Sequence, residues 1–260
     1  MQASDVQLPE AEAIERAVRG GAHARRARAL LIAGDQPGAP GISTAGAVEA
    51  LAVIATDLRA RFAAAGVEIA TLRAAPTRQA VRDAFAACQA ITQGDDLLVV
   101  MFAGHGAEPT ADRPAEAWVL AAGELFSDLD LAAALATYGP DVDVVVISAC
   151  CYGEGFFVPG IAAPGRAAPG LARPLICIAA ASVAGQVTLT KLVALAQDTV
   201  AAAVAGQSYG ELARAFAERA FTGREFHVDA RPPERLADRV LDTAARCGPG
   251  PGLSPADRPS

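Results

Sequence analysis

The sequence of 260 residues has few basic residues, few aromatic side chains and only three histidines. Its 22 lysines and arginines face 29 aspartates and glutamates, so the formal net charge is −7. This acidic balance argues against nucleic acid or an anionic membrane surface as the main partner. No apolar run reaches the length of a transmembrane helix, and four acidic residues among the first 20 exclude the apolar core of a secretory signal. We therefore expect a cytoplasmic protein.

Cofactor-binding patterns are also missing. The five cysteines, Cys88, Cys150, Cys151, Cys177 and Cys247, have none of the paired spacings of a zinc site. The first strand lacks a Gly-x-Gly-x-x-Gly motif, and no phosphate-loop lysine occurs, which argues against a nucleotide-binding domain. No carboxylate cluster has the spacing of calcium ligands. We expect neither a metal nor a cofactor.

What is present is a large supply of core residues, since 52% of the chain is hydrophobic and 20% is charged. Apolar runs typical of strands alternate with runs typical of helices. The strand-like runs show no polar alternation, as in parallel strands that helices cover on both faces. The sequence therefore predicts a three-layer αβα sandwich with a mostly parallel central sheet. Its domain spans residues 27–247, between an N-terminal extension (1–26) and a disordered tail (248–260).

The expected strands cover residues 27–34, 67–72, 95–106, 141–149, 173–182 and 224–230, with a short hairpin at 117–126. The expected helices cover residues 43–66, 78–91 and 127–139, followed by a long helical tract that includes 208–221. Thr77 is positioned to cap the helix at 78–91, and Ser208 with Glu211 matches a capping box.

Two groups with chemical potential follow expected strands. His105 ends the third strand in "FAGHG", and Cys150 and Cys151 end the fourth in "ISACCYGEG". In open α/β sheets, functional groups collect at the carboxyl ends of strands. A thiol becomes a good nucleophile beside a base, most often histidine, and nearby glycines leave main-chain N–H groups free for an oxyanion. The pattern predicts a Cys–His dyad.

Only one of the two cysteines can face His105, because adjacent residues of a strand point to opposite sides. The other is then a buried small hydrophobe. The residues alone leave Cys150 and Cys151 as alternatives.

In "AGHG" (Ala103 to Gly106) and "ACCYGEG" (Ala149 to Gly155), the chain resembles the caspase-like cysteine peptidases, which include caspases, metacaspases and bacterial relatives. The resemblance covers residues 27–181 well and the remainder loosely. Aligning Tyr152 with the His or Tyr of the family motif makes Cys151 the nucleophile and Cys150 a spacer. Gly153 and Glu154 stand where the family has Ser-Gly.

The resemblance implies a thiol endopeptidase that forms an acyl-enzyme on Cys151. His105 would be its general base or its imidazolium partner, and the backbone N–H groups of Gly106 and Cys151 would bind the oxyanion. It also implies a protein or peptide substrate and a separate regulatory partner. Bacterial relatives are often effectors in conflict or cell-death systems, and the Ala-, Arg- and Gly-rich composition fits a bacterium of high GC content. A non-catalytic caspase-like protein that binds partners through its cleft is the alternative.

Substrate preference follows from departures from the family. Ala149 stands where metacaspases carry an acid that binds Arg or Lys, and no arginine of the kind that binds Asp in caspases occurs there or near Val48. We expect Val48, Ala52, Ile54 and Ala149 to line a pocket for a small or apolar residue before the scissile bond, because an unpaired charge there would be costly.

Acidic residues near the motifs have simpler explanations. Asp95 and Asp96 precede a strand and are expected in a solvated turn. Asp128 and Asp130 begin a helix, which fits capping and dipole effects. Asp128 also falls where family members carry acids near the substrate cleft, so it is a candidate substrate-binding residue.

The stretch at residues 152–173, rich in Gly and Pro, corresponds to a segment that relatives often cleave during activation. Arg166 and Arg173 are the candidate cleavage points. An uncut loop on the substrate side is the alternative.

Overall fold

A computed structural model describes residues 25–34, 44–63, 66–72, 76–108, 110–112, 116–151, 175–180, 189–219, 226–231 and 233–242. The extension up to residue 24, the 152–173 loop with its arginines, Cys247 and the tail lie outside these ranges. Within them, no helix combines the length and the apolar character needed to cross a membrane.

The centre of the molecule is a six-stranded sheet in the order β2-β1-β3-β7-β8-β9. Its strands are β1 (Ala27–Ala33), β2 (Val67–Leu72), β3 (Leu97–Ala103), β7 (Asp143–Ala149), β8 (Leu175–Ala180) and β9 (Phe226–Arg231). The first five strands pair in parallel, and β9 joins β8 antiparallel. Every residue of β1 and β3 is buried, as expected for strands covered on both faces.

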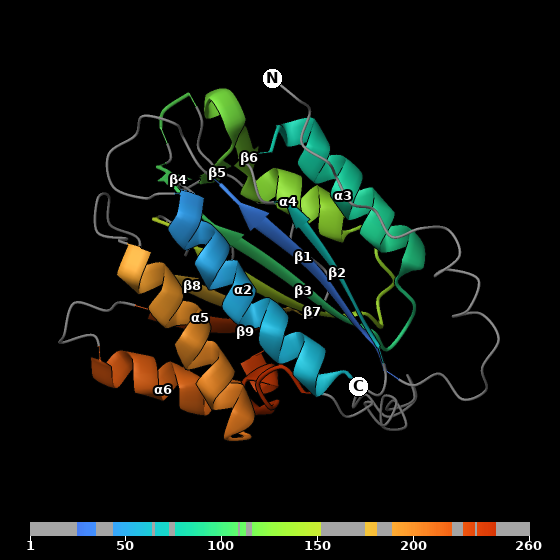
Figure 1. Ribbon diagram of the computed structural model, residues 1–260, viewed down its shortest axis with the longest axis vertical. Coiled ribbons are helices and arrows are strands. Elements are labelled where there is room, and N and C mark those ends of the chain that lie inside the picture. Colours follow the sequence, from blue (N-terminus) through green and yellow to red (C-terminus); the bar gives the residue numbers. More distant parts are fainter. Residues whose placement is uncertain are drawn as a thin grey trace, which may run out of the picture.

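Helices cover both faces of this sheet (Figure 1). One layer holds α2 (Thr44–Arg61), α5 (Leu189–Val204) and α6 (Tyr209–Arg219), and the other holds α3 (Arg78–Ile91) and α4 (Asp128–Leu135). Two 3₁₀ turns, η1 (Ala121–Gly123) and η3 (Pro233–Ala237), lie between these elements and near the end of the described chain. The prediction of a three-layer αβα sandwich with a mostly parallel sheet is confirmed.

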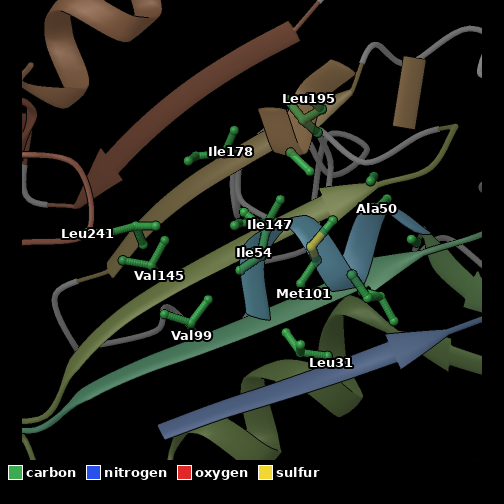
Figure 2. Packing of buried hydrophobic residues seen from close by; sticks show 14 of the residues in the cluster. Leu31, Ala50, Ile54, Val99, Met101, Val145, Ile147, Ile178, Leu195 and Leu241 are labelled. Carbon is green, nitrogen blue, oxygen red and sulfur yellow. The ribbon is translucent and has the colours of Figure 1, made fainter. Parts of the chain in front are cut away.

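The core consists of two apolar clusters, one on each face of the sheet. Figure 2 shows part of the cluster beneath α2 and α5, where Met101 and Ile147 from neighbouring strands lie beside Ile54 of α2. Alternate residues of β3 and β7 supply the two clusters in turn, because successive side chains of a strand point to opposite faces.

The predicted caps are present. Thr77 Oγ1 accepts the N–H of Ala80 at 3.1 Å at the start of α3. Before α6, the Glu211 carboxylate accepts the Ser208 N–H at 2.7 Å, and Ser208 Oγ accepts the Glu211 N–H at 3.2 Å. Each cap satisfies backbone donors that the first helical turn leaves without partners.

A second, antiparallel sheet follows β3 and holds β4 (Gly106–Ala107), β5 (Ala117–Val119) and β6 (Leu125–Ser127). The predicted hairpin is its β5–β6 pair, but the third strand was expected to run through Gly106 and instead ends at Ala103. The chain leaves the main sheet at Gly104, where a Cβ would lie only 2.8 Å from the carbonyl oxygen of Gly34. Gly106 can therefore begin a separate strand.

The prediction of a solvated turn is wrong for Asp96, which is fully buried. Its carboxylate accepts the backbone N–H groups of Arg26 at 3.2 Å and Gln93 at 3.0 Å, and it lies 3.6 Å from the Arg28 guanidinium. These partners compensate for the loss of hydration. Asp96 thereby ties the start of β1 to the start of β3.

A second carboxylate, that of the half-buried Asp143, lies at the amino end of β7. It accepts Arg25 at 2.7 Å through one oxygen and Arg235 through the other, and Arg235 also donates to Asp238 at 3.0 Å. This network joins segments from three distant parts of the chain at one end of the sheet.

Candidate active site

The carboxyl ends of β3 and β7 carry the predicted dyad. The two strands pair in parallel up to Ala103 opposite Ala149, and the N–H of Gly104 still donates to the carbonyl of Ala149 at 3.2 Å. His105 and Cys151 each follow their strand by two residues. They therefore stand at equivalent positions after adjacent strands.

Gly106 shows how closely these two segments approach. A Cβ built on Gly106 would overlap the carbonyl oxygen of Cys151 and would lie 3.2 Å from Cys150 Sγ. No other residue fits without moving one backbone away from the other. The structure thus brings the segment of His105 into direct contact with that of the paired cysteines, while their catalytic roles stay predictions.

The two cysteines belong to opposite faces of the sheet. Cys150 is fully buried in the cluster on the side of α3 and α4, and its Sγ lies 3.3 Å from Ser148 Oγ. Cys151 is 6% exposed and joins the cluster on the side of α2 and α5, with Ile147 and Ala149. The alternation predicted from the sequence is confirmed.

Electrostatics also argues against Cys150 as the nucleophile. Burial raises the pKa of the Cys150 thiol far above its ordinary value, and the hydrogen bond with Ser148 offsets only part of this effect. Cys150 therefore stays protonated at neutral pH, and a protonated thiol is a poor nucleophile. This favours Cys151 among the two alternatives.

His105 is half-buried and held through its backbone, because its carbonyl oxygen accepts the N–H of Val119 at 2.9 Å. Its Nε2 atom is buried and has no hydrogen-bond partner among the described residues. A buried polar atom without a partner is uncommon, and at a strand end it indicates a site that is completed by another group.

The N–H of Gly106 is directed away from β5. Gly106 lies opposite Trp118, and the bond from Val119 to His105 makes this a non-hydrogen-bonded pair, whose N–H and C=O groups point away from the partner strand. This orientation leaves the donor free of β5, as the predicted oxyanion role requires. That role itself stays a prediction.

The residues expected to line a substrate pocket do not share one surface. Ile54 and Ala149 are fully buried in the core, Val48 is half-buried, and Ala52 is exposed on the outer side of α2. Positions two apart on a helix lie on nearly opposite sides. Ala52 and Ile54 therefore cannot line the same pocket, which corrects that prediction.

Asp128 lies at the other end of the small sheet. Its N–H donates to Glu116 at 3.1 Å, beyond the pair of Ala117 and Ser127, whereas His105 accepts the N–H of Val119 at the opposite end of β5. Burial raises the pKa of the Asp128 carboxyl, and its Oδ1 has no partner among the described residues. The structure therefore does not bring Asp128 beside His105.

Asp130 has the capping role expected of it. The N–H and hydroxyl of Ser127 donate to Asp130 Oδ2 at 3.0 and 2.9 Å, and Arg78 and Arg82 donate to its Oδ1 at 2.6 and 2.9 Å.

Sequence reasoning missed a polar contact beneath the site. Trp118 Nε1 donates to Ser148 Oγ at 3.0 Å, and both side chains are fully buried. The available signal was the hydroxyl of Ser148 in an otherwise apolar buried strand, because such a group needs a partner. Among the described residues, no group of three or more His, Cys, Asp or Glu side chains is arranged to hold a metal ion.

Comparisons with known proteins bear on the fold. No model of a protein family matches the chain, and no curated protein matches it either. Among solved structures, the chain is similar to protein GSU0716 from Geobacter sulfurreducens, with a TM-score of 0.56 and 17% sequence identity. The alignment covers 84% of this chain and 100% of the other. At this identity the likeness shows a shared α/β fold and nothing of function.

Proposed function

We propose that this protein is a caspase-like cysteine endopeptidase, with Cys151 as nucleophile and His105 as its proton-transfer partner. The observation that supports it most is the contact of Gly106 with the backbone of Cys151, which sets the two motif segments against each other at adjacent strand ends. The buried Nε2 of His105, without a partner among the described residues, also favours the proposal.

The chemistry follows from these groups. The sulfur of Cys151 attacks the scissile carbonyl carbon, and the thiol proton passes to His105. The N–H groups of Gly106 and Cys151 bind the resulting oxyanion. His105 then protonates the leaving amine as the C–N bond breaks, which leaves a thioester on Cys151. Water, deprotonated by His105, hydrolyses this thioester and restores the thiol.

The proposed substrate is a protein or peptide with an uncharged residue before the scissile bond, because Ala149 stands where an acid would bind a basic side chain. The proposed location is the cytoplasm, where thiols such as the four buried free cysteines stay reduced.

Covalent labelling tests the proposal. An acyloxymethylketone peptide probe should label the wild type at residue 151. It should label Cys150→Ala at the same residue, though more slowly, and should label neither Cys151→Ala nor His105→Ala. Peptide libraries should show cleavage after small or apolar residues. Equal labelling of the wild type and all three variants would contradict the assignment, and strong preference for Arg, Lys or Asp would contradict the specificity.

A non-catalytic caspase-like protein that binds partners is the second candidate. One observation favours it: Cys151 is only 6% exposed and belongs to a core cluster. It predicts that the wild type binds its partner proteins but hydrolyses no peptide and reacts with no probe.

A further inference from the structure

Beneath the candidate site, the indole of Trp118 is held on three sides. Its ring stacks on Phe102 at 4.8 Å with an interplanar angle of 7°, and on Phe126 at 5.7 Å and 17°. Its backbone lies opposite Gly106 in the small sheet. The direction of the indole N–H is therefore set by packing from both sheets.

That N–H reaches the strand of the nucleophile. An indole nitrogen can only donate, so Ser148 Oγ is the acceptor in the 3.0 Å bond from Trp118. Ser148 Oγ also lies 3.3 Å from Cys150 Sγ, and both side chains are fully buried. A continuous line of polar contacts thus runs from β5 to the residue before Cys151.

The line closes on the segment of His105. Cys150 Sγ lies 3.2 Å from the point that a Cβ of Gly106 would occupy, and Gly106 is the strand partner of Trp118. Trp118, Ser148, Cys150 and Gly106 therefore form a closed ring, in which the side chains of Trp118, Ser148 and Cys150 are fully buried. Within this ring, Cys150 directly precedes Cys151 in the sequence, and Gly106 directly follows His105.

We propose that Trp118, Ser148 and Cys150 are positioning residues that hold Cys151 and His105 in register for proton transfer. This inference rests on the proposed peptidase function. It also accounts for the doubled cysteine: Cys150 is a neutral, hydrogen-bonded thiol whose sulfur spaces the two segments, and Cys151 reacts.

The test measures how strongly the reactivity of Cys151 depends on His105. Iodoacetamide alkylation of Cys151, followed by mass spectrometry of its peptide, is compared at neutral pH with and without His105→Ala. The comparison is made in the wild type and in Trp118→Phe, Ser148→Ala, Cys150→Ala and Cys150→Ser. Trp118→Phe removes the N–H and keeps an aromatic ring, and Cys150→Ser keeps a hydrogen-bonding group.

Tyr138→Phe is the matched control. Tyr138 belongs to the same core cluster, and its hydroxyl donates to the Phe85 carbonyl at 2.9 Å in a buried contact away from the ring. Its loss removes the buried hydrogen bond to Phe85 and a contact with Cys88, without touching either motif segment. Melting temperatures of all variants separate a loss of stability from a loss of positioning.

The wild type and Tyr138→Phe should lose about tenfold or more in alkylation rate on His105→Ala, because the thiol of Cys151 then loses the imidazole that favours its reactive thiolate form. In Trp118→Phe, Ser148→Ala and Cys150→Ala, alkylation should already be slow and nearly insensitive to His105→Ala, and Cys150→Ser should recover part of the dependence. If Trp118→Phe does not fold, Ser148→Ala and Cys150→Ala test the same proposal.

If the rate of Cys151 alkylation depends on His105 as strongly in every variant as in the wild type, the positioning role is overturned and the peptidase proposal stands. Absence of the dependence in the wild type itself would overturn the peptidase proposal and the positioning role together.

Discussion

At the amino ends of the central strands, the fully buried Asp96 and the half-buried Asp143 have both carboxylate oxygens engaged by backbone N–H groups or guanidinium groups. At the carboxyl ends, the buried Nε2 of His105 has no hydrogen-bond partner among the described residues. There Gly104 and Gly106 let neighbouring backbone segments approach each other closely. Polar side chains at the amino end of the sheet thus stabilise the fold by pairing with one another, whereas polar groups at the carboxyl end stay available for chemistry. Substitutions at the two ends should therefore separate stability from activity.

The largest effect is expected from His105→Ala. Loss of general acid–base catalysis should lower kcat/KM for peptide hydrolysis by about 10³-fold. The free energy of unfolding should hardly change, because Nε2 makes no hydrogen bond with a described residue. Steady-state kinetics and urea denaturation check the two halves of this prediction. A large loss of stability with unchanged kcat/KM would contradict this prediction, because it would show that His105 stabilises the fold and does not act in catalysis.

Asp143→Ala should do the opposite. It leaves the guanidinium groups of Arg25 and Arg235 buried without their shared carboxylate, which should cost about 3 kcal/mol of unfolding free energy. Hydrolysis per folded molecule should stay unchanged. Asp83→Ala, at an exposed position on α3, is the control and should change stability by less than about 0.5 kcal/mol.

Gly106→Ala tests the contact between the motif segments. The new Cβ would overlap the Cys151 carbonyl, so the two backbones must separate, at a cost of about 2 kcal/mol in unfolding free energy. Labelling of Cys151 by the probe should also be lost. Gly94→Ala is the control, because its Cβ would meet nothing closer than 3.8 Å. Normal labelling of the Gly106 variant would show that the contact does not matter for the site.

The smallest effect concerns pH. Partial burial raises the pKa of Asp130, but hydrogen bonds from Arg78, Ser127 and Arg82 outweigh it and hold the pKa at about 2. The unfolded value is about 3.9, so the ionised carboxylate stabilises the fold fully above about pH 4 and loses this contribution as the pH falls to about 2.

Solvent screening limits this contribution to about 1 kcal/mol. Denaturation between these pH values should show a smaller decline in stability for Asp130→Asn than for the wild type. Equal declines would show that the ion pairs with Arg78 and Arg82 do not stabilise the fold.

Much of the fold could be predicted because its signals are local. The apolar runs of β3 and of β1, where Arg28 is the one polar residue, indicate strands covered on both sides. Thr77 and the Ser208–Glu211 pair mark helix starts by their own chemistry. The succession of His105 and Cys151 after two strands likewise required only the rule that parallel strands end at one edge.

What could not be predicted depends on tertiary partners or on helix phase. Nothing local indicates that Asp96 is buried, because its donors come from the start of β1 and the turn before β3. The pocket on α2 was misplaced because this helix is apolar around much of its circumference, so the pattern does not say whether Ala52 or Ile54 faces the core. The pairing of Trp118 with Ser148 joins residues 30 apart in sequence.

The central claim is that residues 105 and 151 face one another across the ends of β3 and β7. Disulfide trapping measures this without reference to activity: His105→Cys in a Cys150→Ser background, which keeps a hydrogen-bonding group at position 150, is oxidised, and the bridged peptides are identified by mass spectrometry. A bridge forms only when the two Cα atoms lie within about 7 Å. The account predicts rapid and nearly complete bridging between position 105 and Cys151, with none when the new cysteine replaces Phe102 on the opposite face. Failure of position 105 to bridge in the folded protein would contradict it.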